Sequence, residues 1–323
     1  MTGATGFVGK ALIPALIQAG HRVRASTRGA VAVEKSSGPL EWVTCDIGRR
    51  EEVERALLGI DSIFFLVHSM GAGAHDYAQT ELRVARELRE AAARAGVKRI
   101  IYLGGVAPSA EPSEHLKSRL AVGEVLRGGS VPVVELRASM IIGNGSASWQ
   151  IVRDLAMRLP AMLLPSWTES RTCPIAIEDV VVALVRALDV PLVASAWYDI
   201  PGPDTVSGAQ ILSTIASLRG RHVPSLRVPF LSVSLSSWWL KLVTRADFSL
   251  ARELVLGFKA DLLPRDDRYW SEIDYRPRWT FEAAARKALK EEPWPPGLRG
   301  VAGKLEETVV ELVSRKVRPP EPR

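Results

Sequence analysis

The sequence has 323 residues, of which 47% are hydrophobic and 24% charged, and its formal net charge is +6. This is an ordinary globular composition, and the length predicts one main domain plus a smaller lobe. No apolar run approaches the roughly 18 residues that cross a bilayer, so we expect a soluble protein without a transmembrane segment. The two cysteines, Cys45 and Cys173, have no partners at metal-ligand spacing. They predict no disulfide framework and no metal site, and they fit a cytoplasmic protein.

The basic residues are spread along the chain, and part of the excess lies in the last nine residues, RKVRPPEPR. A diffuse positive charge without a recognition motif is a weak indication of nucleic-acid binding. We therefore expect no nucleic-acid partner.

Short β-branched runs alternate with helical patterns in the first half of the chain. The predicted strands cover residues 22–26, 40–45, 62–67, 99–103 and 132–136. The predicted helices cover residues 7–19, 51–58, 77–95 and 113–126. This βαβ rhythm is typical of a parallel sheet with helices on both faces. The predicted fold class is α/β, a Rossmann-type doubly wound parallel sheet with a smaller, mostly helical C-terminal lobe.

The regular rhythm ends after Gly145. The predicted domains are therefore a Rossmann domain over residues 1–145 and a substrate-facing lobe over residues 146–323, with returning strands near residues 172–176 and 197–200. The apolar segment 230–243 is interpreted as a core helix of this lobe, with contact to a membrane surface as the alternative. A last helix is predicted over residues 304–315, before a proline-rich end that we expect to be disordered.

The stretch TGATGFVG places glycines at positions 3, 6 and 9 directly before an apolar helix. Glycine allows a positive φ and a close approach of phosphate to the main chain, and a helix start offers unpaired N–H groups to anions. The alternative is a tight turn without a ligand, which the following βαβ series disfavours. We predict a diphosphate-binding turn that contains Gly3, Thr5, Gly6, Phe7, Val8 and Gly9.

A Rossmann sheet has its first strand immediately before such a turn, at the centre of the sheet. Only Met1 and Thr2 precede Gly3 here. Losing a central strand would leave both neighbouring strands with unpaired backbone groups. We therefore expect that the first strand is truncated and that the true start lies several residues upstream.

The residues after the next strand indicate which dinucleotide binds. Sites that prefer NAD carry an Asp or Glu about 20 residues past the glycines, which binds the ribose hydroxyls. The first acidic residue here is Glu34, whereas Arg28 stands where a ribose 2′-phosphate would lie. A guanidinium can bind that phosphate bidentately, so we expect NADP(H) to be preferred over NAD(H). The alternative for Arg28 is a solvated surface side chain.

Asp46 and Ile47 are the predicted adenine-side contact, and a helix-capping role is the alternative for Asp46.

Several motifs together carry a family resemblance. They are TGATGFVG, CDI, FLVHSMG, RIIYLGG, HLKSR, ELRASMIIGNGSAS and SRTCPIAIEDVV. With them the chain resembles the atypical short-chain dehydrogenase/reductases, near their NAD(P)H-binding, NmrA-like and epimerase-like members, most clearly over residues 1–200. The resemblance implies an NAD(P) site, and members share that site more reliably than any reaction. Val67 ends the predicted strand 62–67, and His68 and Ser69 follow it at the carboxyl edge of the sheet, where we expect backbone contact with the adenosine ribose.

Catalytically active relatives carry a Ser or Thr after the fifth strand and a Tyr-x-x-x-Lys in the next helix. This chain has Gly104 and Gly105, His115 and Arg119 at those places. Arg119 could still bind the nicotinamide ribose, but a guanidinium stays charged and cannot join a proton relay. His115 could replace the tyrosine as general acid because imidazole titrates near neutrality. The alternative is a histidine near a helix start without chemistry.

Two functions stay open. The first is an oxidoreductase that uses NADP(H) on a small carbonyl or quinone-like acceptor, which needs a proton donor that the sequence does not clearly provide. The second is a catalytically inactive NADP(H)-binding sensor or assembly protein, supported by the missing catalytic set beside an intact phosphate turn. The sequence names neither a substrate nor a partner protein.

Overall fold

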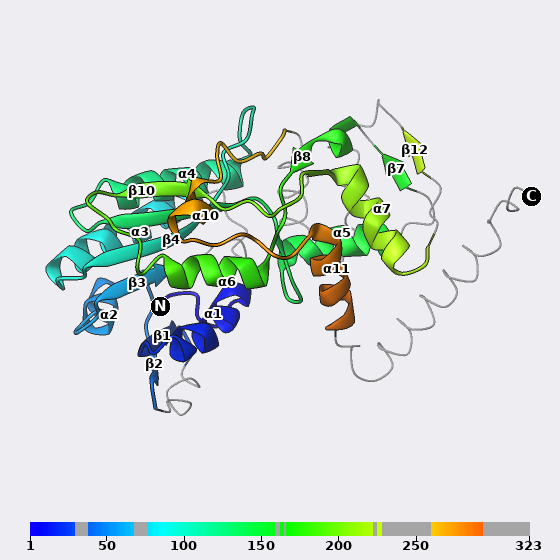
Figure 1. The fold of residues 1–323 in the computed structure, drawn as a ribbon. Coiled ribbons are helices and arrows are strands. Elements are labelled where there is room, and N and C mark those ends of the chain that lie inside the picture. Colours follow the sequence, from blue (N-terminus) through cyan, green and yellow to red (C-terminus); the bar gives the residue numbers. More distant parts are fainter. Residues whose placement is uncertain are drawn as a thin grey trace, which may run out of the picture.

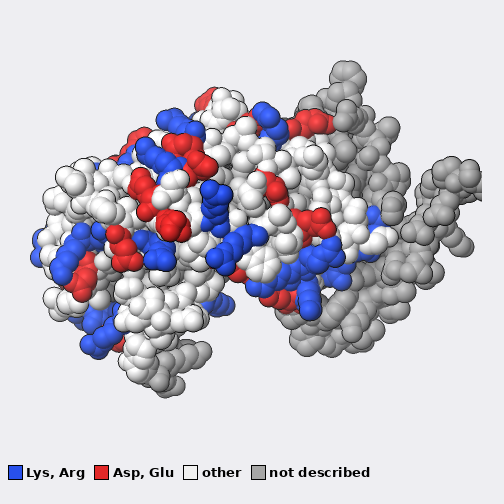
Figure 2. All heavy atoms as spheres, viewed as in Figure 1, with Lys and Arg blue, Asp and Glu red and all other residues white. Residues whose placement is uncertain are grey.

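The computed structural model describes residues 1–29, 38–67, 77–158, 162–164, 166–221, 225–227 and 260–292. A sheet with helices on its faces lies at one end of the molecule, and a second group of helices lies at the other (Figure 1). Lys and Arg side chains are interspersed with Asp and Glu on the face drawn in Figure 2. The predicted helices at 230–243 and 304–315 lie outside the described residues.

Six parallel strands form the main sheet in two blocks, in the order β2-β1 and β3-β4-β5-β10. They are β1 (Val23–Thr27), β2 (Leu40–Thr44), β3 (Ser62–Phe65), β4 (Arg99–Gly105), β5 (Val133–Ala138) and β10 (Ala196–Asp199). All five strands predicted in the first half are present, and the returning strand predicted at 197–200 is β10. The doubly wound parallel fold is confirmed.

Met1 and Thr2 lie between the two blocks. The amine of Met1 donates to the carbonyl of Arg24 at 2.7 Å, and the N–H of Ser26 donates to the carbonyl of Met1 at 2.9 Å. On the other side, the N–H of Thr2 donates to the carbonyl of Phe64 at 2.9 Å. Two residues of main chain therefore occupy the central position of the sheet and connect β1 with β3.

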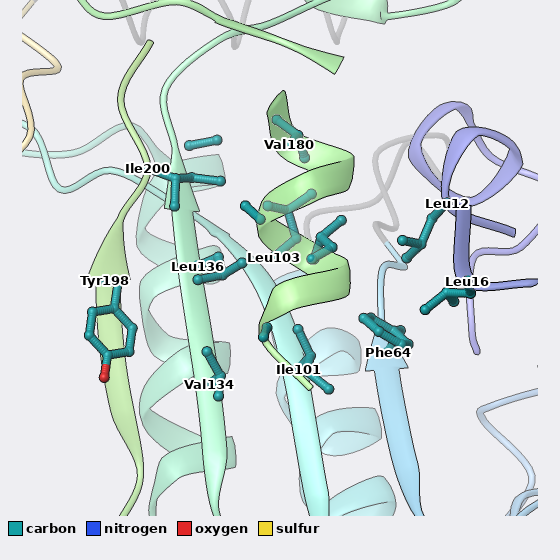
Figure 3. Close-up of a cluster of buried hydrophobic side chains, with 14 of the residues drawn as sticks. Leu12, Leu16, Phe64, Ile101, Leu103, Val134, Leu136, Val180, Tyr198 and Ile200 are labelled. Carbon is teal, nitrogen blue, oxygen red and sulfur yellow. The ribbon is translucent and has the colours of Figure 1, made fainter. Parts of the chain in front are cut away.

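One face of the sheet carries α1 (Phe7–Gln18) and α6 (Ile177–Arg186). Leu12 and Leu16 of α1 and Val180 of α6 contact the sheet there (Figure 3). The sheet-side residues of this first core include Phe64, Ile101, Leu103, Val134, Leu136 and Ile200. α1 continues through Pro14 without a break.

The opposite face carries α2 (Arg50–Ala56), α3 (Tyr77–Arg94) and α4 (Glu114–Arg127). Because side chains alternate along a strand, Ile100 and Tyr102 of β4 belong to this second core, whereas Ile101 and Leu103 belong to the first. The sheet is therefore buried on both faces, as its continuous apolar strands predict.

The second group of helices surrounds a third core, which includes Trp149 and Phe281. Its helices are α5 (Ala147–Arg158), α7 (Gly208–Leu218) and α11 (Phe281–Lys290). The small strand pairs nearby are β6 (Ile141–Ile142) with β9 (Ile175–Ala176), β8 (Arg171–Thr172) with β11 (Val206–Ser207), and β7 (Met162–Leu164) with β12 (Ser225–Arg227). A 3-10 helix, η2, covers Ser166–Glu169.

The returning strand predicted near residues 172–176 is present as two short strands. The chain forms β8 and β9 there, and the two strands pair with different partners on either side of Pro174. Proline has no N–H to donate and fixes its own φ, so it favours a break in the ladder at this point.

The last described segment, residues 260–292, connects both ends of the molecule. Its short helix α10 (Arg268–Glu272) places Tyr269 and Trp270 in the first core, while α11 contributes Phe281 to the third. Across the described residues, no helix combines the length and the apolar character required to cross a bilayer.

Candidate dinucleotide site

The glycine turn follows Met1 and Thr2, the two residues that lie between β1 and β3 at the centre of the sheet. Gly3 has φ of +68°, and a Cβ there would lie 2.7 Å from the carbonyl oxygen of Leu66. A Cβ on Gly9 would lie 2.3 Å from the carbonyl oxygen of Gly3 and 2.7 Å from the Cα of Ala4. Both contacts are far below van der Waals separation, so the turn and the first turn of α1 can meet only when both residues are glycine.

The first N–H groups of α1 are not capped by a side chain. Gly6 is the N-cap residue, no side chain caps the helix, and its first turn carries no acidic residue. Thr5 is exposed beside this start, and Phe7 and Val8 supply first-turn N–H groups. An uncapped helix N-terminus behind a glycine turn fits the diphosphate of a dinucleotide, because amide dipoles and the helix field both attract the anion.

Arg28 is exposed immediately after β1. The arginine within that strand, Arg24, has other partners. Its Nε donates to Glu41 at 2.8 Å, and its Nη1 donates to the backbone carbonyls of Ala56 and Leu58 at the end of α2. Arg22 is exposed before the strand, at the opposite edge of the sheet. Of these three arginines, Arg28 lies at the sheet edge that carries the turn.

The N–H of Cys45 donates to the carbonyl of Thr27 at 2.9 Å, so Asp46 lies near the end of β1. One carboxylate oxygen of Asp46 accepts from the N–H of Gly48 at 3.0 Å. Its other oxygen lies 3.9 Å from the guanidinium of the exposed Arg49, and the Asp46 side chain stays 45% exposed. Ile47 beside it is half-buried. This geometry leaves Asp46 able to contact a bound base while it stabilises its own turn.

Val67 is half-buried after β3, whereas His68 and Ser69 lie outside the described residues. The ribose contact expected of His68 and Ser69 therefore stays a prediction.

Arg119 lies on the sheet-facing side of α4 and is 8% exposed. Its guanidinium donates to the carbonyl of Leu103, near the end of β4, and the hydroxyl of Tyr102 donates to the carbonyl of Arg119 at 3.0 Å. Both contacts fix this part of α4 against β4. The guanidinium is thereby held at the carboxyl edge of the sheet.

His115 lies one turn before Arg119 on α4 and is half-buried. Burial, together with the positive charge of Arg119, lowers the pKa of His115 to about 3. Its imidazole is therefore neutral near pH 7 and offers an N–H donor in place of an acidic proton.

Gly104 and Gly105 close β4 where active relatives carry a hydroxyl. A Cβ on Gly105 would lie 3.0 Å from Leu116 and 3.5 Å from the guanidinium Nε of Arg119. A serine there would therefore require the Leu116 side chain to shift by a few tenths of an ångström. The end of β4 provides backbone groups in place of a catalytic hydroxyl.

Sequence reasoning missed a buried charge cluster behind this site. Glu135 of β5 is fully buried and forms ion pairs with Arg127 and Arg137. The available signal was a single charged residue, Glu135, directly after the apolar run VPVV in a predicted strand. An acidic residue is rarely fully buried unless it is paired, so that pattern indicates a buried ion pair.

Residues 3–157 match the NAD(P)H-binding family. The chain is 26% identical over 231 residues to the ceramide reductase of Caulobacter vibrioides, which covers 71% of this chain and 73% of that protein. It is 35% identical over 112 residues to the 3-beta-hydroxysteroid dehydrogenase of Mycolicibacterium neoaurum, which covers 32% of this chain and 30% of that relative.

Solved structures share the fold over most of the chain. The crystal structure of gox2253 superposes with a TM-score of 0.69 at 21% identity, covering 90% of this chain and 96% of that one. MoeE5 in complex with UDP-glucuronic acid and NAD superposes with a TM-score of 0.68 at 18% identity, with the same coverage of both chains. The UDP-glucose 4-epimerase of Thermotoga maritima gives 0.66 at 14% identity, again covering 90% and 96%. These structures show a shared fold, and the match to the NAD(P)H-binding family covers residues 3–157 of the chain.

Proposed function

We propose that the chain is an NADP(H)-dependent oxidoreductase that interconverts a ketone and a secondary alcohol on a hydrophobic substrate. The observation that supports this proposal is that two features lie at the same edge of the sheet. One is the uncapped start of α1 behind Gly3 and Gly9. The other is the guanidinium of Arg119, held at the end of β4.

In the proposed reaction, the bound dinucleotide supplies a hydride to the carbonyl carbon. Arg119 would hold the nicotinamide ribose through the N–H donors of its guanidinium. His115 would donate a hydrogen bond from its neutral imidazole to the carbonyl oxygen, because a neutral imidazole can polarise a carbonyl without giving up its proton. The proton that completes the alcohol would come from solvent, so His115 need not ionise.

The substrate class follows from the two curated relatives. One is named for reduction of a ceramide and the other for oxidation of a 3β-hydroxysteroid, both of which are lipids with hydroxyl groups. We extend this to the present chain as a lipid-like ketone or secondary alcohol. We place the activity in the cytoplasm, since both cysteines, Cys45 and Cys173, are free.

A second candidate is an NADP(H)-binding protein without catalysis. It is favoured by the glycines at the end of β4 and by the pKa of His115 near 3, which leaves no protonated acid near neutral pH. In that case, binding of the dinucleotide would change the conformation of a surface that contacts another protein.

Turnover separates the two candidates. The wild-type chain is mixed with NADPH and a panel of long-chain and steroidal ketones, and loss of NADPH absorbance is followed. We expect oxidation with at least one lipid ketone, and its loss in Arg119→Ala. Tight NADPH binding with no oxidation across the panel would exclude the enzyme and favour the binding protein.

Arg28→Ala should weaken NADPH binding about tenfold and leave NADH binding unchanged, since one charge-assisted hydrogen bond contributes about 1.5 kcal/mol or more. Calorimetric titration of both dinucleotides measures the difference. Arg22→Ala is the matched control, because Arg22 is also exposed but precedes β1 at the other sheet edge. Equal loss of NADH and NADPH affinity in Arg28→Ala would contradict the preference for the phosphorylated cofactor.

A further inference from the structure

The carboxylate of Glu135 is buried between β5 and α4. Its side chain is 0% exposed, and Arg137 donates to it through Nε at 2.7 Å. Its other oxygen forms an ion pair with Arg127, the last residue of α4. The guanidinium of Arg137 also stacks 4.2 Å from the ring centroid of Trp197. The carboxylate therefore joins the end of α4 to β5, and Arg137 extends the contact to Trp197 of β10.

Glycines leave the space that this carboxylate fills. A Cβ on Gly123 of α4 would lie 2.5 Å from one carboxylate oxygen of Glu135 and 2.6 Å from the other. A Cβ on Gly104 of β4 would lie 3.0 Å from the same group. Helix and sheet therefore contact each other through Glu135 at this point, and no larger residue fits at position 123 without a shift.

The same stripe of α4 carries the candidate active-site residues. His115, Arg119, Gly123 and Arg127 follow one another at intervals of four residues, so they lie along one side of the helix. The stripe is held at Arg119 by Leu103 and Tyr102, and at its end by Glu135. An axial shift or rotation of α4 would move all four positions together.

We propose that Glu135 is a positioning residue, which fixes α4 on the sheet through Gly123 and Arg127 and so sets where His115 and Arg119 stand. Its effect on turnover rests on the proposed function, whereas its effect on the position of the helix does not. A buried ion pair is often no more stabilising than a well-packed apolar group. The directional contacts of Glu135 with two guanidiniums therefore point to geometry as its contribution.

Two variants test this. Glu135→Gln keeps the size of the side chain and removes its charge, and Gly123→Ala adds a Cβ against the carboxylate. Gly128→Ala is the control on the same helix, because a Cβ there meets its nearest atom at 3.4 Å, an ordinary contact, and its φ of −76° suits alanine.

The first readout is the titration of His115, followed by NMR in the intact chain. Its pKa is about 3 mainly because the ring is buried, with a smaller contribution from Arg119 on the same helix, so a displaced helix that exposes the ring removes the main cause. We expect the pKa of His115 to rise by about one unit or more in both variants and to stay unchanged in Gly128→Ala.

The second readout is turnover with the lipid ketone. Small misplacements of catalytic groups reduce turnover steeply, so kcat should fall about 10- to 100-fold with little change in KM. An unchanged His115 titration in Glu135→Gln would overturn the positioning role, even if turnover falls. If the wild type shows no turnover at all, the proposed function fails, and the titration still decides the role of Glu135.

Discussion

Replacing Gly9 with alanine should weaken NADPH binding by about 100-fold or more. The added Cβ would lie 2.3 Å from the carbonyl oxygen of Gly3 and 2.7 Å from the Cα of Ala4, both of which are backbone atoms that no rotamer change can move. The start of α1 must then separate from the turn, and the N–H groups that would hold the diphosphate no longer converge. Losing two such charge-assisted bonds weakens binding by about 100-fold or more.

Calorimetric titration with NADPH measures this loss, and circular dichroism checks that Gly9→Ala is folded. Gly128→Ala is the matched control, since it is also a Gly-to-Ala change at a helix and meets only ordinary contacts. NADPH affinity in Gly9→Ala equal to that of the wild type would place the dinucleotide elsewhere.

Asp179→Ala should give the largest loss of stability. Asp179 is fully buried in the first turn of α6, and its carboxylate accepts from the Tyr275 hydroxyl at 2.6 Å. It also accepts from the backbone N–H groups of Arg278 and Trp279, at 3.2 and 3.3 Å. Alanine would leave these three donors without their acceptor. We expect the free energy of unfolding to fall by about 3 to 5 kcal/mol, a large share of the stability of an ordinary domain.

Urea unfolding measures the change. The control is Glu178→Ala at the neighbouring position, where a partly exposed carboxylate pairs with Lys287 and should contribute less than about 1 kcal/mol. A similar loss in both variants would mean that Asp179 does not hold the segment 275–279 on α6. The three hydrogen bonds to Asp179 attach the last described segment to α6.

Local patterns were sufficient to predict the sheet and its helices. The strands at 62–65 and 99–105 are short apolar runs between helices with clear periodicity, so local sequence and tertiary burial favour the same structure. The glycine turn was predictable for the same reason, because the geometry that Gly3 and Gly9 allow is a property of the residue type.

Other features depend on contacts between distant residues. The strands β8 and β9 are each two residues long. β8 pairs with β11 and β9 with β6, and each depends on its partner strand more than on its own sequence. The backbone N–H groups that donate to Asp179 lie about a hundred residues further along the chain, so no local pattern reveals them. The low pKa of His115 likewise arises from burial against the sheet, which the reference pKa of free imidazole does not convey.

Hydrogen–deuterium exchange of the wild-type chain with and without NADPH tests the central claim most directly, since it reports where the dinucleotide binds. Backbone amides of residues 3–10 should become protected on addition of NADPH, together with those near Asp46. Protection confined to other parts of the chain, or no protection at saturating NADPH, would contradict a diphosphate site at the start of α1.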